Sequence, residues 1–394
     1  MLNRRILRVK AFQNLYAYEL CKASNFNLAK DQIKVAFLPD LNSMETQDKV
    51  QLKKDAEICT SLFSTNLNSK TLISQQDVST KIKSEAIKAI NAYHKANDKD
   101  YDFLLKNMIS SAELIPQLYL NSIQLLIAFA EHVEKEAERK RKLSTEQVVS
   151  ASGELNFAKN VILKKLKSLP EFETAIIRHD ALLDDLELEI KDWFRQYVKP
   201  SEQYQEYIKI AQPSREDDFN ILESILKKII FKNEVILNFF SEKDMNWTEN
   251  KSVVRSLAGK VVKNVYEQLE EGAELLPEIA MNWEDDKEFF QNIFNLTIEN
   301  EDLNKELIAK KTQNWDIERI AFTDKIIMSM AITEMKNFPS IPVKVSINEY
   351  IDISKTYSTP KSKQFVNGLL DVLSKEMMEN GEIKKSGRGL LDNK

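Results

Sequence analysis

The chain has 394 residues, of which 43% are hydrophobic and 30% are charged, and its formal net charge is −5 at pH 7. It contains only seven glycines, although glycine usually makes up about 7% of a protein and builds tight turns and phosphate-binding loops. This composition excludes a turn-rich β protein and an enzyme built on a Gly-rich nucleotide loop.

The cysteines and histidines stand singly, with no spacing typical of a zinc site. We therefore expect no metal, no cofactor and a reducing compartment. Arg8 and Lys10 interrupt the apolar residues of the first segment, which therefore lacks the apolar core of a signal peptide. No stretch approaches the ~20 apolar residues that cross a bilayer, so the sequence predicts a cytoplasmic protein without a membrane partner.

Apolar residues recur at helical spacing along almost the whole chain, which predicts an all-α fold. We expect helices over residues 3–21 and 43–68, each capped by the polar residue at its first position. Further helices are expected over 79–96 and 100–143, the second with a kink or break at Pro116.

Two charged runs and one linker candidate interrupt this pattern. Residues 135–142 hold five Lys or Arg and two Glu at the end of an expected helix. That run fits a solvated helix end, or a patch that faces RNA or a membrane. Residues 267–288 hold nine acidic residues and one lysine, which fits a solvated connector or a dock for a basic partner. The segment 144–153 is the best linker candidate.

The last third of the chain changes character. Residues 316–336 are apolar on all sides, as in a helix surrounded by other helices. Asp324, Lys325 and Glu334 must then lie at its seams or ends. Beyond Pro342, Ser346 and the acidic residue three positions later have the spacing of a capping box.

The final helix is expected to open at Ser362, and Phe365 lies off its apolar stripe by roughly a quarter turn. Lys361 and Lys363 flank this helix start. Unpaired N–H groups, two lysines and an aromatic ring together suit a contact with single-stranded RNA. The alternative is that Phe365 is a boundary core residue and the lysines are solvated.

The N-terminal helix has a similar mixture. Arg4, Arg5 and Arg8 fall within an arc of ~100° on a helical wheel, and Gln13 and Tyr16 follow them. The first 22 residues hold five basic side chains and one acidic side chain. This local reversal of the overall negative charge is what a phosphate-binding arm needs.

These two ends together resemble the NusB family of bacterial transcription antitermination factors. The segments that carry the resemblance are RRILR and AFQNLY within residues 4–16, IPVKVSINE at 341–349 and KQFVNGLLD at 363–371. Their order and spacing are specific, although the N-terminal segments alone are short. The chain departs from the family pattern at Ser329, Ser358, Pro360, Lys361 and Gln364.

The resemblance implies a pair of small helical bundles, with a large helical insertion in the N-terminal half. The implied parts are the first helix of the N-terminal bundle at 1–22, the insertion at 23–212, a continuation of that bundle at 213–284, a C-terminal core at 285–380 and a flexible tail at 381–394. It also implies an activity without catalysis. The protein would bind boxA-type RNA of ribosomal leader transcripts together with NusE, a small-subunit ribosomal protein, in an antitermination complex on RNA polymerase.

The same resemblance implies particular site residues. Positions that match the RNA-associated segments are Arg4, Arg5, Arg8, Gln13, Tyr16, Phe365, Asn367 and Gly368, and Lys361 and Lys363 add positive charge beside them. Asp324, with Lys325 next to it, matches a position near the surface for RNA and NusE. Gly368 would admit either another helix or the RNA backbone.

The sequence leaves two other classes of protein as alternatives. A helical interaction scaffold, whose insertion provides the main binding surface, is the alternative that the charged runs motivate. An RNA-modifying enzyme with a NusB-like domain, such as a cytosine methyltransferase, would need a Gly-rich cofactor loop and a strand-rich domain. The low glycine content and the helical insertion argue against that enzyme.

Overall fold

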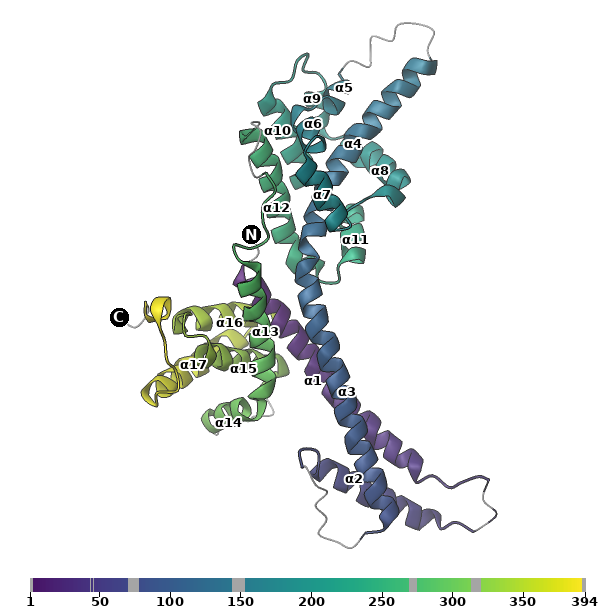
Figure 1. The fold of residues 1–394 in the computed structure, drawn as a ribbon, viewed down its shortest axis with the longest axis vertical. Helices are drawn as coiled ribbons and strands as arrows, with labels where there is room; N and C mark the ends of the chain where they lie inside the picture. Colours follow the sequence, from purple (N-terminus) through teal and green to yellow (C-terminus); the bar gives the residue numbers. More distant parts are fainter. Residues whose placement is uncertain are drawn as a thin grey trace. The chain divides into compact units, whose positions relative to one another are not determined.

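The computed structural model describes residues 3–42, 44, 46–69, 78–143, 153–268, 275–312 and 320–391. Within these ranges the regular structure is helical and no strand occurs (Figure 1). The predicted all-α fold is therefore confirmed. None of the helices in these ranges has an apolar stretch long enough to cross a bilayer. Nor do their His, Cys, Asp and Glu side chains gather in groups of three or more that suit a metal ion.

The chain forms two compact units. The first unit comprises residues 1–7 and 109–287, and the second comprises 8–108 and 288–394. The division falls inside the helices α1, α3 and α13. The boundaries that the family resemblance implies, such as an insertion over 23–212, stay a prediction.

The first unit is built around α4, which packs against α12 and against the short helices α5, α6 and α8 (Figure 1). Its elements are α4 (Ile115–Leu143), α5 (Leu155–Ala158), α6 (Val161–Lys167), α7 (Pro170–Arg178), η2 (Asp184–Leu186), α8 (Glu187–Trp193), the π-helix η3 (Phe194–Val198), α9 (Glu202–Tyr207), α10 (Arg215–Ser224), the π-helix η4 (Ile225–Ile230), α11 (Glu234–Lys243) and α12 (Trp247–Glu267). The predicted break at Pro116 is confirmed, because α4 starts one residue before it.

The second unit contains the C-terminal helices together with most of the long N-terminal ones. Its elements are α1 (Arg4–Ala36), α2 (Lys49–Thr65), α3 (Thr80–Glu113), α13 (Trp283–Glu299), α14 (Glu301–Lys311), α15 (Phe322–Asn337), α16 (Val343–Tyr357), α17 (Ser362–Glu379) and η6 (Gly387–Leu390). Helix α15 packs against α14, α16 and α17. Its residues from Ile326 to Met335 are all buried, which confirms a helix surrounded by others.

Two helices are longer than the sequence predicted. Helix α1 continues past Cys21 to Ala36, and α3 runs without a break through the polar residues near 97–100. The reason is a lateral contact, because Asn25 donates hydrogen bonds to Asn97 and Asp100 at 2.9 and 2.7 Å. Polar side chains that indicated a loop therefore satisfy each other between two helices.

Of the two N-terminal helix caps that the sequence predicts, the cap of α1 forms as expected and the cap of α2 is a different residue. The Asn3 side chain accepts a hydrogen bond from the Ile6 N–H at 3.1 Å, so this cap is confirmed. The α2 cap is Asp48, which accepts from the N–H groups of Val50 and Gln51, and not Ser43. Ser43 lies outside the described residues.

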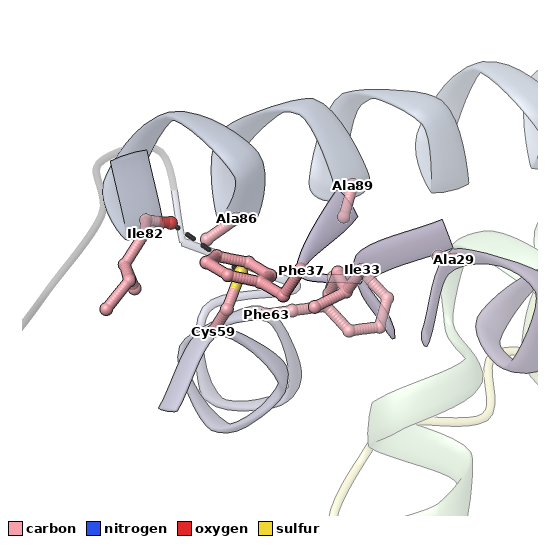
Figure 2. Close-up of a cluster of buried hydrophobic side chains, with 8 residues drawn as sticks. All are labelled: Ala29, Ile33, Phe37, Cys59, Phe63, Ile82, Ala86 and Ala89. Carbon is pink, nitrogen blue, oxygen red and sulfur yellow. Dashed lines mark hydrogen bonds between the residues drawn. The ribbon is translucent and has the colours of Figure 1, made fainter. Parts of the chain in front are cut away.

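Helices α1, α2 and α3 share a small apolar core of their own (Figure 2). Its buried members are Ala29, Ile33, Phe37, Cys59, Phe63, Ile82, Ala86 and Ala89. The Cys59 thiol donates to the Ile82 carbonyl at 3.6 Å, and burial raises the pKa of this thiol to about 11. This core explains why the apolar period continues along α1 beyond its predicted end.

The segment after α17 returns to the second unit. Ile383 is buried, and the Lys385 ammonium donates to the Phe338 carbonyl at 2.9 Å. The Ser386 N–H donates to the Pro339 carbonyl at 3.0 Å. Gly389 lies so close to the same carbonyl that a Cβ at this position would stand 2.0 Å from it.

Candidate nucleic-acid interface

The first two arginines of α1 lie in the first unit. Arg4 keeps 41% of its side chain exposed, and its Nε lies 3.3 Å from Asp286 Oδ1. Arg5 is exposed. Surface ion pairs of this kind contribute only about 0–1 kcal/mol, so the Arg4 guanidinium can exchange its carboxylate for a phosphate.

Arg8, the third predicted phosphate contact, is buried in the second unit with 3% exposure. Its Nε and one terminal nitrogen each donate to the carboxylate of Glu334 at 2.7 Å. Its guanidinium also lies 5.1 Å from the centre of the Phe289 ring. Burial on its own would lower the pKa of Arg8, but the hydrogen bonds and charge of Glu334 outweigh it and raise that pKa. Arg8 therefore joins α1 to α15 and does not present its charge to solvent.

Two further hydrogen-bond donors to Glu334 come from α16. The hydroxyls of Ser346 and Tyr350 donate to its carboxylate at 2.7 and 3.0 Å. Helix α16 starts at Val343 after Pro342, three residues before the predicted cap at Ser346. The capping-box prediction was wrong, because the Ser346 side chain bonds to the buried carboxylate instead of to its own helix end. The prediction that Glu334 lies at a helix seam is confirmed.

Aromatic rings cluster where α1 meets the start of α15 and the end of α16. The Tyr16 ring meets the Phe322 ring edge-on at a centroid distance of 5.4 Å. Phe12 lies between Tyr16 and Tyr357, with its ring centroid 5.4 Å from that of Tyr357. Phe322 keeps 41% of its surface exposed. Exposed rings of this kind provide stacking faces for bases.

A chain of hydroxyls ties the start of α17 to the same place. The Ser362 hydroxyl donates to Asp324 at 2.6 Å and lies 3.0 Å from the Ser358 hydroxyl. The Ser358 hydroxyl in turn lies 2.8 Å from that of Thr323. The start of α15, the end of α16 and the start of α17 therefore meet at one end of the bundle. Asp324 is buried there with 3% exposure, so its carboxylate holds the start of α17 and is shielded from solvent.

The predicted residues on α17 remain on the surface. Lys361 and Lys363 are exposed at the helix start, and Phe365 and Asn367 are half-buried. A Cβ added to Gly368 would meet no atom within 4 Å. Helix packing among the described residues therefore gives no reason for a glycine here.

Lys325 lines a largely apolar cavity of about 370 Å³ in the second unit. Helices α1, α13, α14 and α15 contribute to its walls, and Leu15 and Phe322 are among the lining residues. Lys325 is half-buried. Phe322 thus lines this cavity and also meets Tyr16, so the cavity and the ring cluster adjoin.

Tyr16 lies in a cluster with two rings that the sequence did not single out, Phe322 and Tyr357. The start of α17, with Lys361 and Lys363, lies at the same end of the bundle. Arg4 and Arg5 belong to the other unit. The sequence signal for a buried ion pair is Glu334, an acidic residue in a largely apolar stretch of α15. No local pattern identified Arg8 as that partner, because 326 positions separate the two residues.

Comparison with known proteins supports the resemblance. The model of the NusB family matches residues 252–375. The transcription antitermination protein NusB of Chloroherpeton thalassium is 48% identical over 107 residues, which are 27% of this chain and 50% of that protein. The protein of the same name from Salinibacter ruber is 40% identical over 105 residues, 27% of this chain and 66% of its own length. This chain therefore spans half of the first relative and just under two thirds of the second.

The protein of that name from Dictyoglomus turgidum is 35% identical over 105 residues, which are 26% of this chain and 70% of that protein. No solved structure matches the chain. The segment 4–16 lies outside the range of the family match, yet its Arg8 and Phe12 pack on α15 and α16 within that range. On these similarities, the chain belongs to the NusB family.

Proposed function

We propose that this protein is an RNA-binding transcription antitermination factor without catalytic activity. It acts in the cytoplasm, where it binds boxA-type leader RNA together with NusE in a complex on RNA polymerase. Membership of the NusB family and the names of its relatives support this proposal.

One observation carries the proposal. Tyr16 and the exposed ring of Phe322 lie at the end of the bundle where α17 begins with Lys361 and Lys363. Stacking on aromatic rings contributes about 1–3 kcal/mol per base, and lysines supply the phosphate contacts. A ring pair and two exposed cations at one end of a bundle suit a short single strand better than a duplex.

Some of the predicted residues are proposed to contact RNA, and others hold the helices in place. In this proposal Arg4, Arg5, Lys361 and Lys363 contact phosphates, and Gln13 with the half-buried Phe365 and Asn367 borders the bases. The open position of Gly368 lets the RNA backbone approach α17. Arg8 and Asp324 hold the helices in place, because both are buried and form hydrogen bonds with residues of other helices.

Lys325 is the proposed contact to NusE. It lines the apolar cavity that Phe322 also borders, and an apolar pocket with a charged side chain in its wall suits an anchor residue of a protein partner. A partner bound there would lie beside RNA stacked on Phe322. This neighbourhood would couple the two binding events.

The test is binding of labelled boxA RNA and of a scrambled RNA, each with and without NusE. The wild type is expected to bind boxA RNA more tightly than the scrambled RNA. Phe322→Ala is expected to weaken binding without changing the salt slope, because a stacking face is lost and no phosphate contact is. Lys361→Ala with Lys363→Ala is expected to reduce the slope of log K against log salt by about 1.4. The matched control is Lys375→Ala with Lys384→Ala, two exposed lysines elsewhere on the C-terminal segment. Unchanged boxA affinity in both test variants would overturn the proposed surface.

A further inference from the structure

The first unit contains a basic pocket that the proposed function does not use. The pocket has a volume of about 370 Å³ and lies between the C-terminal half of α4 and the continuous turns of α8 and η3. Its lining residues are His132, Lys135, Glu136, Arg139, Lys140, Glu187, Leu188, Lys191 and Arg195. The basic run at 135–142, noted in the sequence, thus forms one wall.

Cations outnumber anions in this pocket by five to two, without His132. One carboxylate, Glu136, lies 3.5 Å from Arg195, and the other, Glu187, lies 3.5 Å from Lys135. Arg139 and Lys191 form no ion pair with any residue in the described ranges. In a chain of net charge −5, the pocket is a local positive site with two cations available to a ligand.

Burial and the excess of positive charge lower the pKa of His132. Its side chain is 14% exposed, its ring meets Phe194 edge-on, and its Nε2 lies 3.9 Å from Glu136. That nitrogen is buried without a hydrogen-bond partner among the described residues. Burial lowers the pKa of His132, and Arg195, Lys191 and Arg139 lower it further against the opposing charge of Glu136. A bound anion would reverse part of this effect.

We propose that this pocket is a second RNA contact, which binds backbone phosphates of a single strand irrespective of base sequence. The inference rests on the proposed RNA-binding function, and it gives the large helical part outside the family match a role in that function. Its contribution to affinity is electrostatic and therefore sensitive to salt.

The character of the lining favours an RNA backbone over other anions. No Phe, Tyr or Trp is among the described residues that line the pocket, and the one ring there, that of His132, is 14% exposed and packs against Phe194, so it offers a base little stacking surface. Lys135 and Arg195 are 60% and 50% exposed, whereas a site for a small phosphate compound encloses its ligand with convergent donors. The row of cations continues along α4 to the exposed Arg141 and Lys142, which suits an extended polyanion.

An acidic protein segment is a poorer fit. Protein interfaces depend on apolar anchors at their centre, and Leu188 is the one large aliphatic side chain among the lining residues. Electrostatic attraction without an apolar centre is the usual mode of binding to a phosphate backbone.

The test uses a double variant, Arg139→Ala together with Lys191→Ala, which removes two pocket cations that form no ion pair with the described residues. It is compared with a control double variant that has the same change in charge. The control is Lys164→Ala with Lys228→Ala, two exposed lysines of the same unit that do not line the pocket. The full-length pocket variant is expected to bind boxA RNA and scrambled RNA more weakly by the same factor, and to lose about 1.4 from the salt slope. The control is expected to match the wild type.

A second readout locates the ligand. Three histidines are present, so the His132 resonance can be assigned by substitution, and RNA is expected to move its titration midpoint upward. Inorganic pyrophosphate and poly-glutamate are added in separate arms. A shift with either of these but not with RNA would overturn the inference, as would an unchanged salt slope in the pocket variant. Weaker RNA binding by Phe322→Ala at an unchanged salt slope reports separately on the proposed function.

Discussion

The guanidinium of Arg8 and the carboxylate of Glu334 form a buried pair with two hydrogen bonds of 2.7 Å, although 326 positions separate them in the sequence. The hydroxyls of Ser346 and Tyr350 complete the carboxylate's hydrogen bonds. Burial and the charge of Glu334 also raise the pKa of Tyr350 well above its ordinary value, which keeps the phenol protonated as a donor. One carboxylate therefore joins α1, α15 and α16, the helices that bear the ring cluster.

Arg8→Met is expected to lower the free energy of unfolding by about 3–5 kcal/mol, because it leaves the buried Glu334 carboxylate without its cation. Arg4→Met is the matched control, since Arg4 is 41% exposed and its ion pair contributes about 0–1 kcal/mol. Urea denaturation followed by circular dichroism measures both. Equal losses in the two variants would contradict the structural role of Arg8.

The RNA-binding role of the N-terminal arginines is tested by changing Arg4 and Arg5 and keeping Arg8, because Arg8 is buried in the fold. Arg4→Ala with Arg5→Ala is expected to reduce the salt slope of RNA binding by about 1.4 and to leave the fold intact. Binding is measured by fluorescence anisotropy at several salt concentrations, after circular dichroism has shown an unchanged helix content. A salt slope equal to that of the wild type would show that these two arginines contact no phosphate.

Gly368→Ala separates folding from binding on α17. Because a Cβ at this position meets nothing within 4 Å, the substitution is expected to stabilise the helix by about 0.5–1 kcal/mol. The same methyl group is expected to weaken RNA binding if the backbone approaches here. Thermal denaturation and anisotropy on the same samples measure the two effects. Increased stability with full RNA affinity would remove Gly368 from the proposed interface.

The three-helix core around Cys59 predicts a local effect. Phe63→Ala is expected to cost about 3–5 kcal/mol and to accelerate the reaction of the Cys59 thiol with a thiol reagent. Burial raises the pKa of Cys59 to about 11, so this thiol reacts slowly in the native state. The rate is measured in a Cys21→Ser background. The control is Val50→Ala on the same helix, where the side chain is 65% exposed, and an equal acceleration there would refute a local core.

Local patterns in the sequence predicted the helical class, the buried helix α15 and the start of α17. They failed where a distant residue decides the outcome. Asn97 and Asp100 indicated a break, but Asn25 satisfies both within continuous helices. Ser346 had the spacing of a cap, but Glu334 accepts its hydrogen bond. The pairing of Arg8 with Glu334 was missed for the same reason. A helical wheel predicts which face of its helix a residue occupies, but not which other helix covers that face.

Lys385 predicts a pH dependence of stability above neutrality. Burial lowers the pKa of its ammonium to about 8, against the opposing charge of Glu334, whereas an unfolded lysine titrates near 10.4. Between these values the unfolded chain holds a proton that the native protein has released, so the free energy of unfolding rises with pH by up to about 1.4 kcal/mol per unit. Lys385→Met is expected to remove this rise, and Lys384→Met, at an exposed neighbour, to retain it. Urea denaturation at pH 7, 8, 9 and 10 measures the difference. Parallel profiles for wild type and Lys385→Met would show that this ammonium keeps its proton in the folded protein, because only a native pKa below the unfolded one separates the two curves.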